Sequence, residues 1–221
     1  MDAETPKAGR LNLPQAFLLL ATNDADGKPE IPVFALRAGL AGAILAELDR
    51  SGAVELRGKH VRAAGAPAPP GFEHELELIR HKSRPHTPRA WVSMFEGRAV
   101  VQRVYEAMAS LGIVERAGER HLGLFRTVRY PGKDHGPKAT LMRDLESALR
   151  SPAAPPAGSV APDARLLALI ALSEASGLFG KLFPAADRVW ADELAKDYWP
   201  SRAVEDELRL VRLAEEEAAT L

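Results

Sequence analysis

Two segments carry side chains of the kinds that bind metal ions. The segment HELELIRH contains His74 and His81, and paired histidines on one helix are common zinc ligands. At about 1.5 Å of rise per residue, these two side chains would lie roughly 10 Å apart along a helix, too far for one ion. The segment TNDADGKPE starts like a calcium-binding loop, but Thr22 and Val33 stand where that loop requires acidic ligands. We therefore expect a solvated helix face and a turn, and no metal site.

The rest of the sequence has no pattern typical of an active site. It contains no glycine-rich phosphate loop, nucleophile elbow or dinucleotide fingerprint. The acidic and histidine side chains are scattered over expected helix surfaces, where charge mainly provides solubility. We predict a protein that is not an enzyme and that needs no cofactor.

A basic hairpin is the most distinctive feature of the sequence. The segment ERHLGLFRTVRYP, residues 119–131, follows a Gly-centred turn signal and places apolar residues between basic ones. The apolar residues are Leu122, Leu124 and Phe125, and the basic residues that follow them include Arg126 and Arg129. Such a hairpin could lie along DNA, enter a membrane surface, or fold back onto the core of its own protein.

The segment before the hairpin leaves a nucleic-acid alternative open. RAVVQRVYEAMASLG is an amphipathic helix, and a helix followed by a basic hairpin matches the outline of a winged helix. However, this helix offers few side chains that read bases, and its outer face mixes Arg103 with Glu106. The formal net charge is -1, so no whole-protein field favours DNA. Nucleic acid is therefore not the first choice of partner.

The composition is that of a globular domain. The chain has 221 residues, of which 46% are hydrophobic and 27% charged, enough to form one core. Cysteine is absent, which excludes disulfides and cysteine-based zinc sites. The N-terminal residues do not resemble a signal peptide, and the apolar runs are shorter than the roughly 20 residues of a membrane span. We expect a cytoplasmic protein that contacts membranes only peripherally.

The hydrophobic periodicity predicts about nine helices and two small hairpins, an all-α domain. Two helices, residues 33–50 and 163–178, are apolar on nearly every side and belong in the core. Gly39 and Gly42 in the first of them are expected at close helix contacts. The other helices are expected at residues 13–22, 72–81, 87–95, 98–112, 136–150, 187–199 and 201–219, and a first hairpin at AVEL and KHVRAA.

Several segments together resemble the Golgi phosphoprotein 3 family, in its bacterial branch. They are AFLLLATNDADGK, GLAGAILAELDRSGAVEL, WVSMF, HLGLFRTVRYP and DARLLALIALSEASGLFGKLFP, in order from about Leu13 to about Ala218. The resemblance implies a central four-helix bundle ringed by amphipathic helices, as a single domain over 13–221 after a flexible leader, 1–12. It also implies a non-enzymatic, peripheral adaptor that binds phosphatidylinositol 4-phosphate and recognises the cytosolic tails of Golgi glycosyltransferases.

The lipid-binding residues that the resemblance implies are only partly present. The family's pocket uses one tryptophan and three arginines. The tryptophan position falls on Pro32 and two arginine positions fall on Ala41 and Val101, whereas Arg98 matches. Arg37 lies one helical turn before Ala41 and could partly replace the missing charge.

Arg103 could play the same part near Val101. The resemblance also aligns HLGLF with a hairpin that enters the bilayer, which implies that Leu122, Leu124 and Phe125 reach the headgroup layer, flanked by Arg126 and Arg129. The expected partners are anionic phospholipid headgroups on the inner face of the membrane. A packed hairpin in a protein-interaction scaffold without lipid binding remains an alternative, as does the winged helix.

Overall fold

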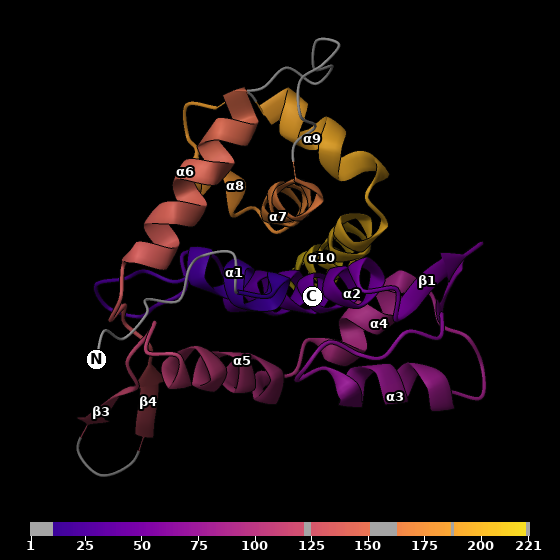
Figure 1. Cartoon of the computed structure of the whole chain (residues 1–221), viewed down its shortest axis with the longest axis horizontal. Coiled ribbons are helices and arrows are strands. Elements are labelled where there is room, and N and C mark those ends of the chain that lie inside the picture. The colour runs from indigo at the N-terminus through magenta and orange to yellow at the C-terminus, as the bar shows by residue number, and fades with distance from the viewer. Residues whose placement is uncertain (1–10, 122–124, 151–162, 187, 220–221) are drawn as a thin grey trace.

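The structure of the protein is a computed structural model, and it describes residues 11–121, 125–150, 163–186 and 188–219. Within these residues the chain forms ten helices and two antiparallel hairpins, which confirms the predicted all-α class with small hairpins (Figure 1). The helices are α1 (Leu13–Leu20), α2 (Val33–Arg50), α3 (Glu73–His81), α4 (Pro88–Phe95), α5 (Arg98–Ser110), α6 (Gly136–Arg150), α7 (Ala164–Ala175), α8 (Phe179–Leu182), α9 (Arg188–Asp197) and α10 (Trp199–Ala219). The strands are β1 (Val54–Arg57), β2 (His60–Ala63), β3 (Ala117–His121) and β4 (Phe125–Arg129).

Helix α2 lies at the centre of the fold, as predicted from a sequence that is apolar on nearly every side. It packs against α1, α4, α7 and α10, and every residue from 38 to 48 is buried. A helix that is apolar on all sides has no face to give to solvent, so it must be surrounded. The amphipathic helices α3, α5 and α6 lie outside this centre (Figure 1).

Two glycines of α2 allow its neighbours to approach closely. A Cβ atom on Gly39 would collide with the ring of Phe17 in α1, and one on Gly42 would collide with Val204 in α10. The prediction that these glycines mark close helix contacts is therefore confirmed. Interiors are packed at crystal-like density, so a side chain at either position would force the neighbouring side chains to shift.

The predicted helix starts agree with the structure where a capping side chain marks them. The Thr87 side chain accepts a hydrogen bond from the backbone of Ala90, at 3.4 Å, and Asp163 accepts one from Arg165, at 3.0 Å. Leu11 is buried and Asn12 caps α1, so the packed domain already includes the last two residues of the predicted 1–12 leader. Residues 1–10 lie outside the described part of the chain.

The helix predicted over residues 163–178 is shorter in the structure. Helix α7 ends at Ala175, and Gly177 follows with φ of 76°, a left-handed conformation that glycine adopts without strain. The short helix α8 comes next, and its Phe179 is fully buried. The predicted helix therefore ran three residues too far, through the turn that precedes α8.

Both predicted hairpins are present. Strands β1 and β2 pair antiparallel around Gly58, which has φ of 61°, and β3 pairs with β4 from Ala117–Arg129 to His121–Phe125. In Figure 1 the β3–β4 hairpin leaves the helical body beside the end of α5. The backbone of this hairpin is described, whereas the side chains of residues 119–127 and all of residues 122–124 are outside the described part.

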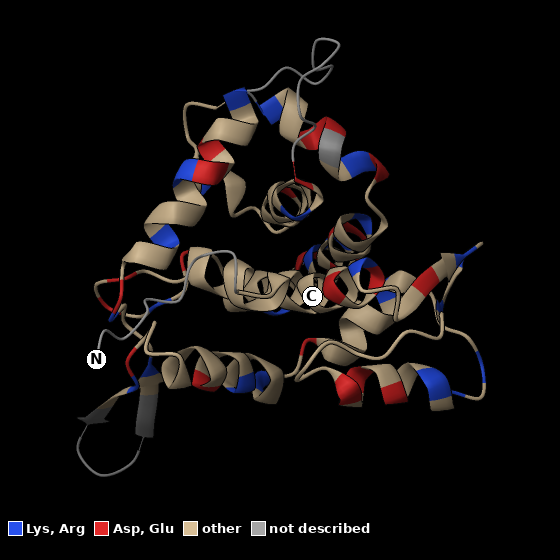
Figure 2. Cartoon of the chain, in the orientation of Figure 1, with Lys and Arg blue, Asp and Glu red and all other residues tan. Residues whose placement is uncertain are grey.

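Charged residues of both signs are interspersed over the outer faces of the helices, as Figure 2 shows. This distribution agrees with the formal net charge of -1. None of the helices in the described ranges combines the length and the apolar composition that crossing a bilayer requires.

Candidate anion-binding pocket

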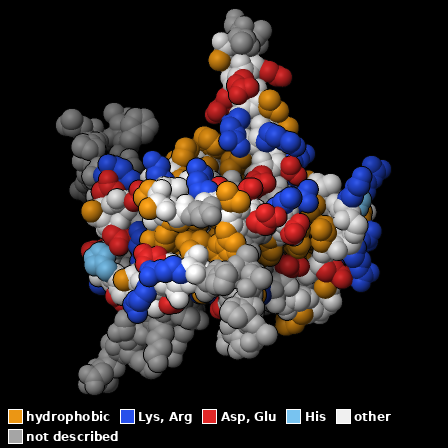
Figure 3. All heavy atoms as spheres, turned by 90° about the horizontal axis from the view of Figure 1, so that it is seen from above, with side chains coloured by type: hydrophobic (Ala, Val, Ile, Leu, Met, Phe, Trp, Pro, Cys, Tyr) orange, Lys and Arg blue, Asp and Glu red, His pale blue; other side chains and the backbone are white. Residues whose placement is uncertain are grey.

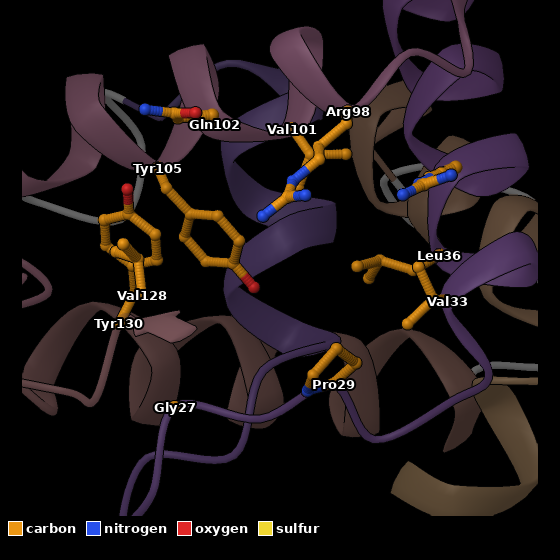
Figure 4. A pocket seen from close by; sticks show the side chains of 11 residues that line it. Gly27, Pro29, Val33, Leu36, Arg98, Val101, Gln102, Tyr105, Val128 and Tyr130 are labelled. Carbon is orange, nitrogen blue, oxygen red and sulfur yellow. The ribbon is translucent and has the colours of Figure 1, made fainter. Parts of the chain in front are cut away.

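A cavity of about 200 Å³ lies where the first turns of α2 and α5 meet (Figure 4). Helix α2 contributes one wall and α5 another. The turn after α1 forms a third side, and the segment around the end of β4 closes the fourth. The lining residues are Gly27, Pro29, Val33, Leu36, Arg37, Arg98, Val101, Gln102, Tyr105, Val128 and Tyr130.

The spacing of residues on α5 places four side chains on the cavity. Arg98, Val101, Gln102 and Tyr105 stand at positions i, i+3, i+4 and i+7, which share one face of a helix. In Figure 4 the Arg98 side chain extends from α5 into the space bounded by Leu36 and Tyr105. One face of α5 therefore carries a guanidinium group at its start and an aromatic ring two turns later.

Helix α2 supplies the second guanidinium group. Val33, Leu36 and Arg37 line the cavity from positions i, i+3 and i+4 of its first turns. Arg37 is half-buried and Arg98 is exposed, and within the described residues neither has an ion-pair or hydrogen-bond partner.

Several other arginines of the described chain are paired with carboxylates. Arg50 binds Glu47 at 2.7 Å, and Arg89 binds Glu207 at 2.9 Å. Glu96 is an acid that interacts electrostatically with Arg37: burial and Glu207 raise its pKa, and the attraction to Arg37 opposes that rise. Glu96 makes no direct ion pair with Arg37, so within the described structure no carboxylate is bound to either guanidinium group of the cavity.

The backbone adds to this positive potential. Helix α2 begins after Pro32 and α5 after Gly97, neither start has a side-chain cap, and neither first turn carries an acid. The uncapped N–H groups and the helix dipoles both favour an anion near these ends. The cavity thus combines two helix starts with two guanidinium groups, a combination suited to phosphate or carboxylate.

A stacked tyrosine pair forms the aromatic wall. The rings of Tyr105 and Tyr130 lie 4.3 Å apart and are inclined by 3°. Thr22 donates its hydroxyl hydrogen to the carbonyl of Leu18 at 2.6 Å, so the Tyr105 hydroxyl, 2.7 Å from Thr22 Oγ1, donates to that oxygen. Burial raises the pKa of Tyr105 to about 12, so its hydroxyl remains a hydrogen-bond donor well into the alkaline range. The Tyr130 hydroxyl is buried without a partner among the described residues.

The turn after α1 forms the floor of the cavity. Gly27 has φ of 67°, and a Cβ atom there would lie 2.5 Å from the Tyr130 nitrogen and 2.6 Å from the Pro131 nitrogen. The segment TNDADGKPE was predicted only as a turn, which the structure confirms. The contact of Gly27 with the backbone after β4 joins this turn to the tyrosine wall.

A set of polar contacts around Asp24 fixes the floor to α6. Lys138 donates from Nζ to Asp24 Oδ1 at 3.0 Å and to the carbonyl of Thr22 at 2.5 Å. His135 Nδ1 lies 3.2 Å from Asp24 Oδ2, and the Gly132 N–H donates to the Asp24 carbonyl at 2.9 Å. We call these residues the Asp24 clamp. Asp24 of this turn therefore has a structural role, and Asp26 forms an ion pair with Lys28 at 2.8 Å.

The structure brings together two of the three predicted arginines. Arg37 and Arg98 line one cavity, and Val101, an expected departure from the family pattern, lines it as well. Ala41 is fully buried within α2. Pro32 instead lines a second cavity of about 450 Å³ on the other side of the α2 start.

Arg103 does not line the cavity, contrary to expectation. It lies five residues after Arg98, about 140° round the helix at 100° per residue, and so faces elsewhere. Its Nη2 atom donates to Glu75 Oε1 at 2.5 Å, and its guanidinium lies 5.9 Å from the ring centre of Phe72. Glu75 is buried, so the predicted solvated face of α3 is partly wrong: α3 uses this carboxylate to bind α5.

The hairpin borders the cavity through Val128 in β4. Leu122 and Leu124 lie outside the described residues, as do the side chains of Phe125 and Arg126, so insertion of this tip into a membrane stays a prediction. Arg129 is half-buried at the end of β4, where its charge helps to lower the pKa of Asp26, after the larger effects of Lys28.

Sequence reasoning missed the aromatic wall and the floor. Tyr105 is spaced from Arg98 and Gln102 as one helix face requires, so the pattern of α5 contained that signal. Gly27 and Tyr130 had no such signal, because their contact joins segments about a hundred positions apart in the chain. The described residues contain no cluster of histidines, cysteines and acids that could hold a metal ion.

The family of the chain follows from its sequence match. The family model for Golgi phosphoprotein 3 (GPP34) matches residues 13–211. No curated protein matches the chain. The matched residues run from the start of α1 into α10 and include every residue that lines the cavity. Because the match covers far more than half of the sequence, the chain belongs to the Golgi phosphoprotein 3 family.

Proposed function

We propose that this protein is a non-enzymatic, peripheral membrane-binding protein that holds the phosphate of an anionic phospholipid between α2 and α5. One observation carries the proposal: Arg37 and Arg98, both without a carboxylate partner in the described structure, line the same cavity. Family membership supports it, since the resemblance implies phosphatidylinositol 4-phosphate as the ligand of this domain. The protein would act from the cytoplasm, on the inner face of the membrane.

The expected affinity is modest. Each charge-assisted hydrogen bond to phosphate contributes about 1.5–3 kcal/mol, and this cavity offers two guanidinium groups where the family pattern has three. Val101 occupies one of the missing positions and adds apolar surface instead of charge. The β3–β4 hairpin would add a second, interfacial contact, because a few apolar side chains with basic neighbours give weak and reversible binding.

Co-sedimentation with vesicles tests the proposal. Neutral phosphatidylcholine vesicles are compared with vesicles that also contain phosphatidylserine or phosphatidylinositol 4-phosphate. We expect the wild-type protein to pellet with the anionic vesicles, and Arg37→Ala and Arg98→Ala each to bind less. The double variant should bind no better to anionic than to neutral vesicles.

The matched control is Arg62→Ala, which removes the same charge from an exposed site on β2. Arg62→Ala should bind the vesicles as the wild type does. If binding depended only on the total positive charge of the protein, all three single variants would bind less, and by the same amount. Adding excess inorganic phosphate tests whether the cavity prefers a free anion. Phosphate should release the protein from the vesicles if a free anion is preferred, and should leave it bound if a lipid headgroup is preferred. If the wild type stays in the supernatant with every vesicle at low salt, the lipid function is refuted.

A further inference from the structure

Helix α10 carries a second apolar stripe that nothing in the described structure covers. Leu210 is 45% exposed and Leu213 is 48% exposed, and the two lie one turn apart. Among the large hydrophobic residues that the described structure leaves exposed, they stand out as a pair on consecutive turns of one helix. Ala214, also exposed, extends the stripe.

This stripe is distinct from the face by which α10 packs on the body. Val204, Leu208 and the half-buried Val211 stand at i, i+4 and i+7 and form the packed face. At 100° per residue, Leu210 lies about 100° and Leu213 about 160° round the helix from Val211. A surface helix needs only one apolar face, so the second implies another partner.

The end of α10 stands out from the body. From residue 209 to 219 every residue but Val211 is exposed, and in Figure 3 the last turns of α10 form the narrow column at the top. This segment has about three turns, and isolated helices of that length are marginal in water. A partner along the stripe would supply the packing that the segment lacks within its own chain.

The order of charges on the same segment fits a second copy of it. Arg209 and Arg212 come first, and Glu215, Glu216 and Glu217 follow. When two identical helices pair antiparallel about a two-fold axis, the same flank of each faces the other. Arg209 and Glu216 lie on one flank, seven residues apart. Arg209 of one copy would therefore face Glu216 of the second copy, and the reverse. The three glutamates also disfavour an anionic membrane as the partner.

We propose that the protein self-associates through α10, with Leu210 and Leu213 of two copies packed antiparallel about a two-fold axis close to Leu213. The acidic half of this segment lies beyond residue 211, where the family match ends. The interface is short compared with standard interfaces of about 1,200–2,000 Å², so the dimer is expected to dissociate on dilution. The proposal is independent of lipid binding, because the stripe and the cavity share no residue.

Single-cysteine crosslinking tests the geometry, because the chain has no cysteine of its own. With the axis beside residue 213, Leu213→Cys brings two thiols together under oxidation and yields a disulfide dimer. Glu217→Cys, the matched control, puts its two Cα atoms roughly 12–14 Å apart along the axis, beyond the 7 Å limit for a disulfide. A dimer from both variants would indicate a parallel pair and overturn the proposal, and a dimer from neither would overturn it too.

Sedimentation velocity of the wild-type protein over a concentration series gives the second test. The average mass should rise from monomer towards dimer, and Arg209→Glu should shift that rise to at least several-fold higher concentration. Combining Arg209→Glu with Glu216→Arg restores opposite charges across the axis and should recover the wild-type curve. Circular dichroism checks that each variant stays folded. A wild-type protein that remains monomeric at every concentration, or a double variant no better than the single, overturns the proposal.

Discussion

Replacing Gly27 by alanine should destabilise the protein far more than the loss of one glycine normally does. Gly27 has φ of 67°, and alanine in a left-handed conformation costs about 1–2 kcal/mol. The new Cβ atom would also lie 2.5–2.7 Å from backbone atoms of Tyr130 and Pro131, which cannot rotate away. Such overpacking typically costs a further 1–3 kcal/mol, so the expected total is about 2–5 kcal/mol.

Gly58 provides the matched control, because it has φ of 61° but no atom within 4 Å of the Cβ position. Gly58→Ala should therefore lose only the conformational part, about 1–2 kcal/mol. For a chain of this length each kcal/mol lowers the melting temperature by about 2–4 °C, so calorimetry can separate the two variants.

The same pair of variants probes the cavity. Gly27→Ala should weaken binding to anionic vesicles, because its methyl group pushes the floor away from the tyrosine wall, whereas Gly58→Ala should bind normally. Equal loss of stability in the two variants would show that the close contact between the turn and residues 130–131 does not exist. The account of the floor would then be wrong.

Two further predictions concern buried polar groups. Glu47→Ala removes the carboxylate that accepts the Leu13 N–H at 2.8 Å, so thermal unfolding should reveal a loss of about 1–3 kcal/mol. The control is Glu55→Ala, which removes a half-buried carboxylate whose partner, Arg57, is exposed, and it should keep near-wild-type stability. If the two variants are equally stable, the Glu47 contact contributes nothing. Burial raises the pKa of Tyr105 to about 12, above the ordinary tyrosine value of about 10. The protonated Tyr105 hydroxyl therefore contributes fully to the free energy of unfolding below pH 10, and this contribution is lost as the pH rises from 10 to 12. In urea titrations Tyr105→Phe should flatten that alkaline decline by up to about 1.4 kcal/mol per pH unit, and an unchanged slope would contradict the assignment.

The sequence was sufficient for features that depend on neighbouring residues. Thr87 and Asp163 identified helix starts because a capping side chain acts within three residues of itself. The apolar character of α2 placed it at the centre, and its two glycines indicated close contacts. The meeting of Arg37 with Arg98 was expected only through the resemblance to a family, since no local pattern relates α2 to α5.

Features that depend on distant residues were not predictable in this way. The pairing of Arg103 with Glu75 joins two helices 28 positions apart, and no periodicity distinguishes a buried carboxylate from a solvated one. Glu47 occupies an inward-facing position of an otherwise apolar helix, where its role becomes clear only from the start of α1 beside it. In both cases the partner, rather than the residue itself, decides whether a charge can be buried.

The Asp24 clamp has a mechanical consequence. It connects the cavity floor to α6 and to the stretch that follows β4, so the floor and the base of the hairpin are held together by several polar contacts. In the proposed function the cavity and the hairpin both contact the membrane. When two weak contacts are joined in this way, the first holds the second at high effective concentration, as in a chelating ligand. Loosening Asp24 would then cost avidity for a lipid surface even though that residue never touches it.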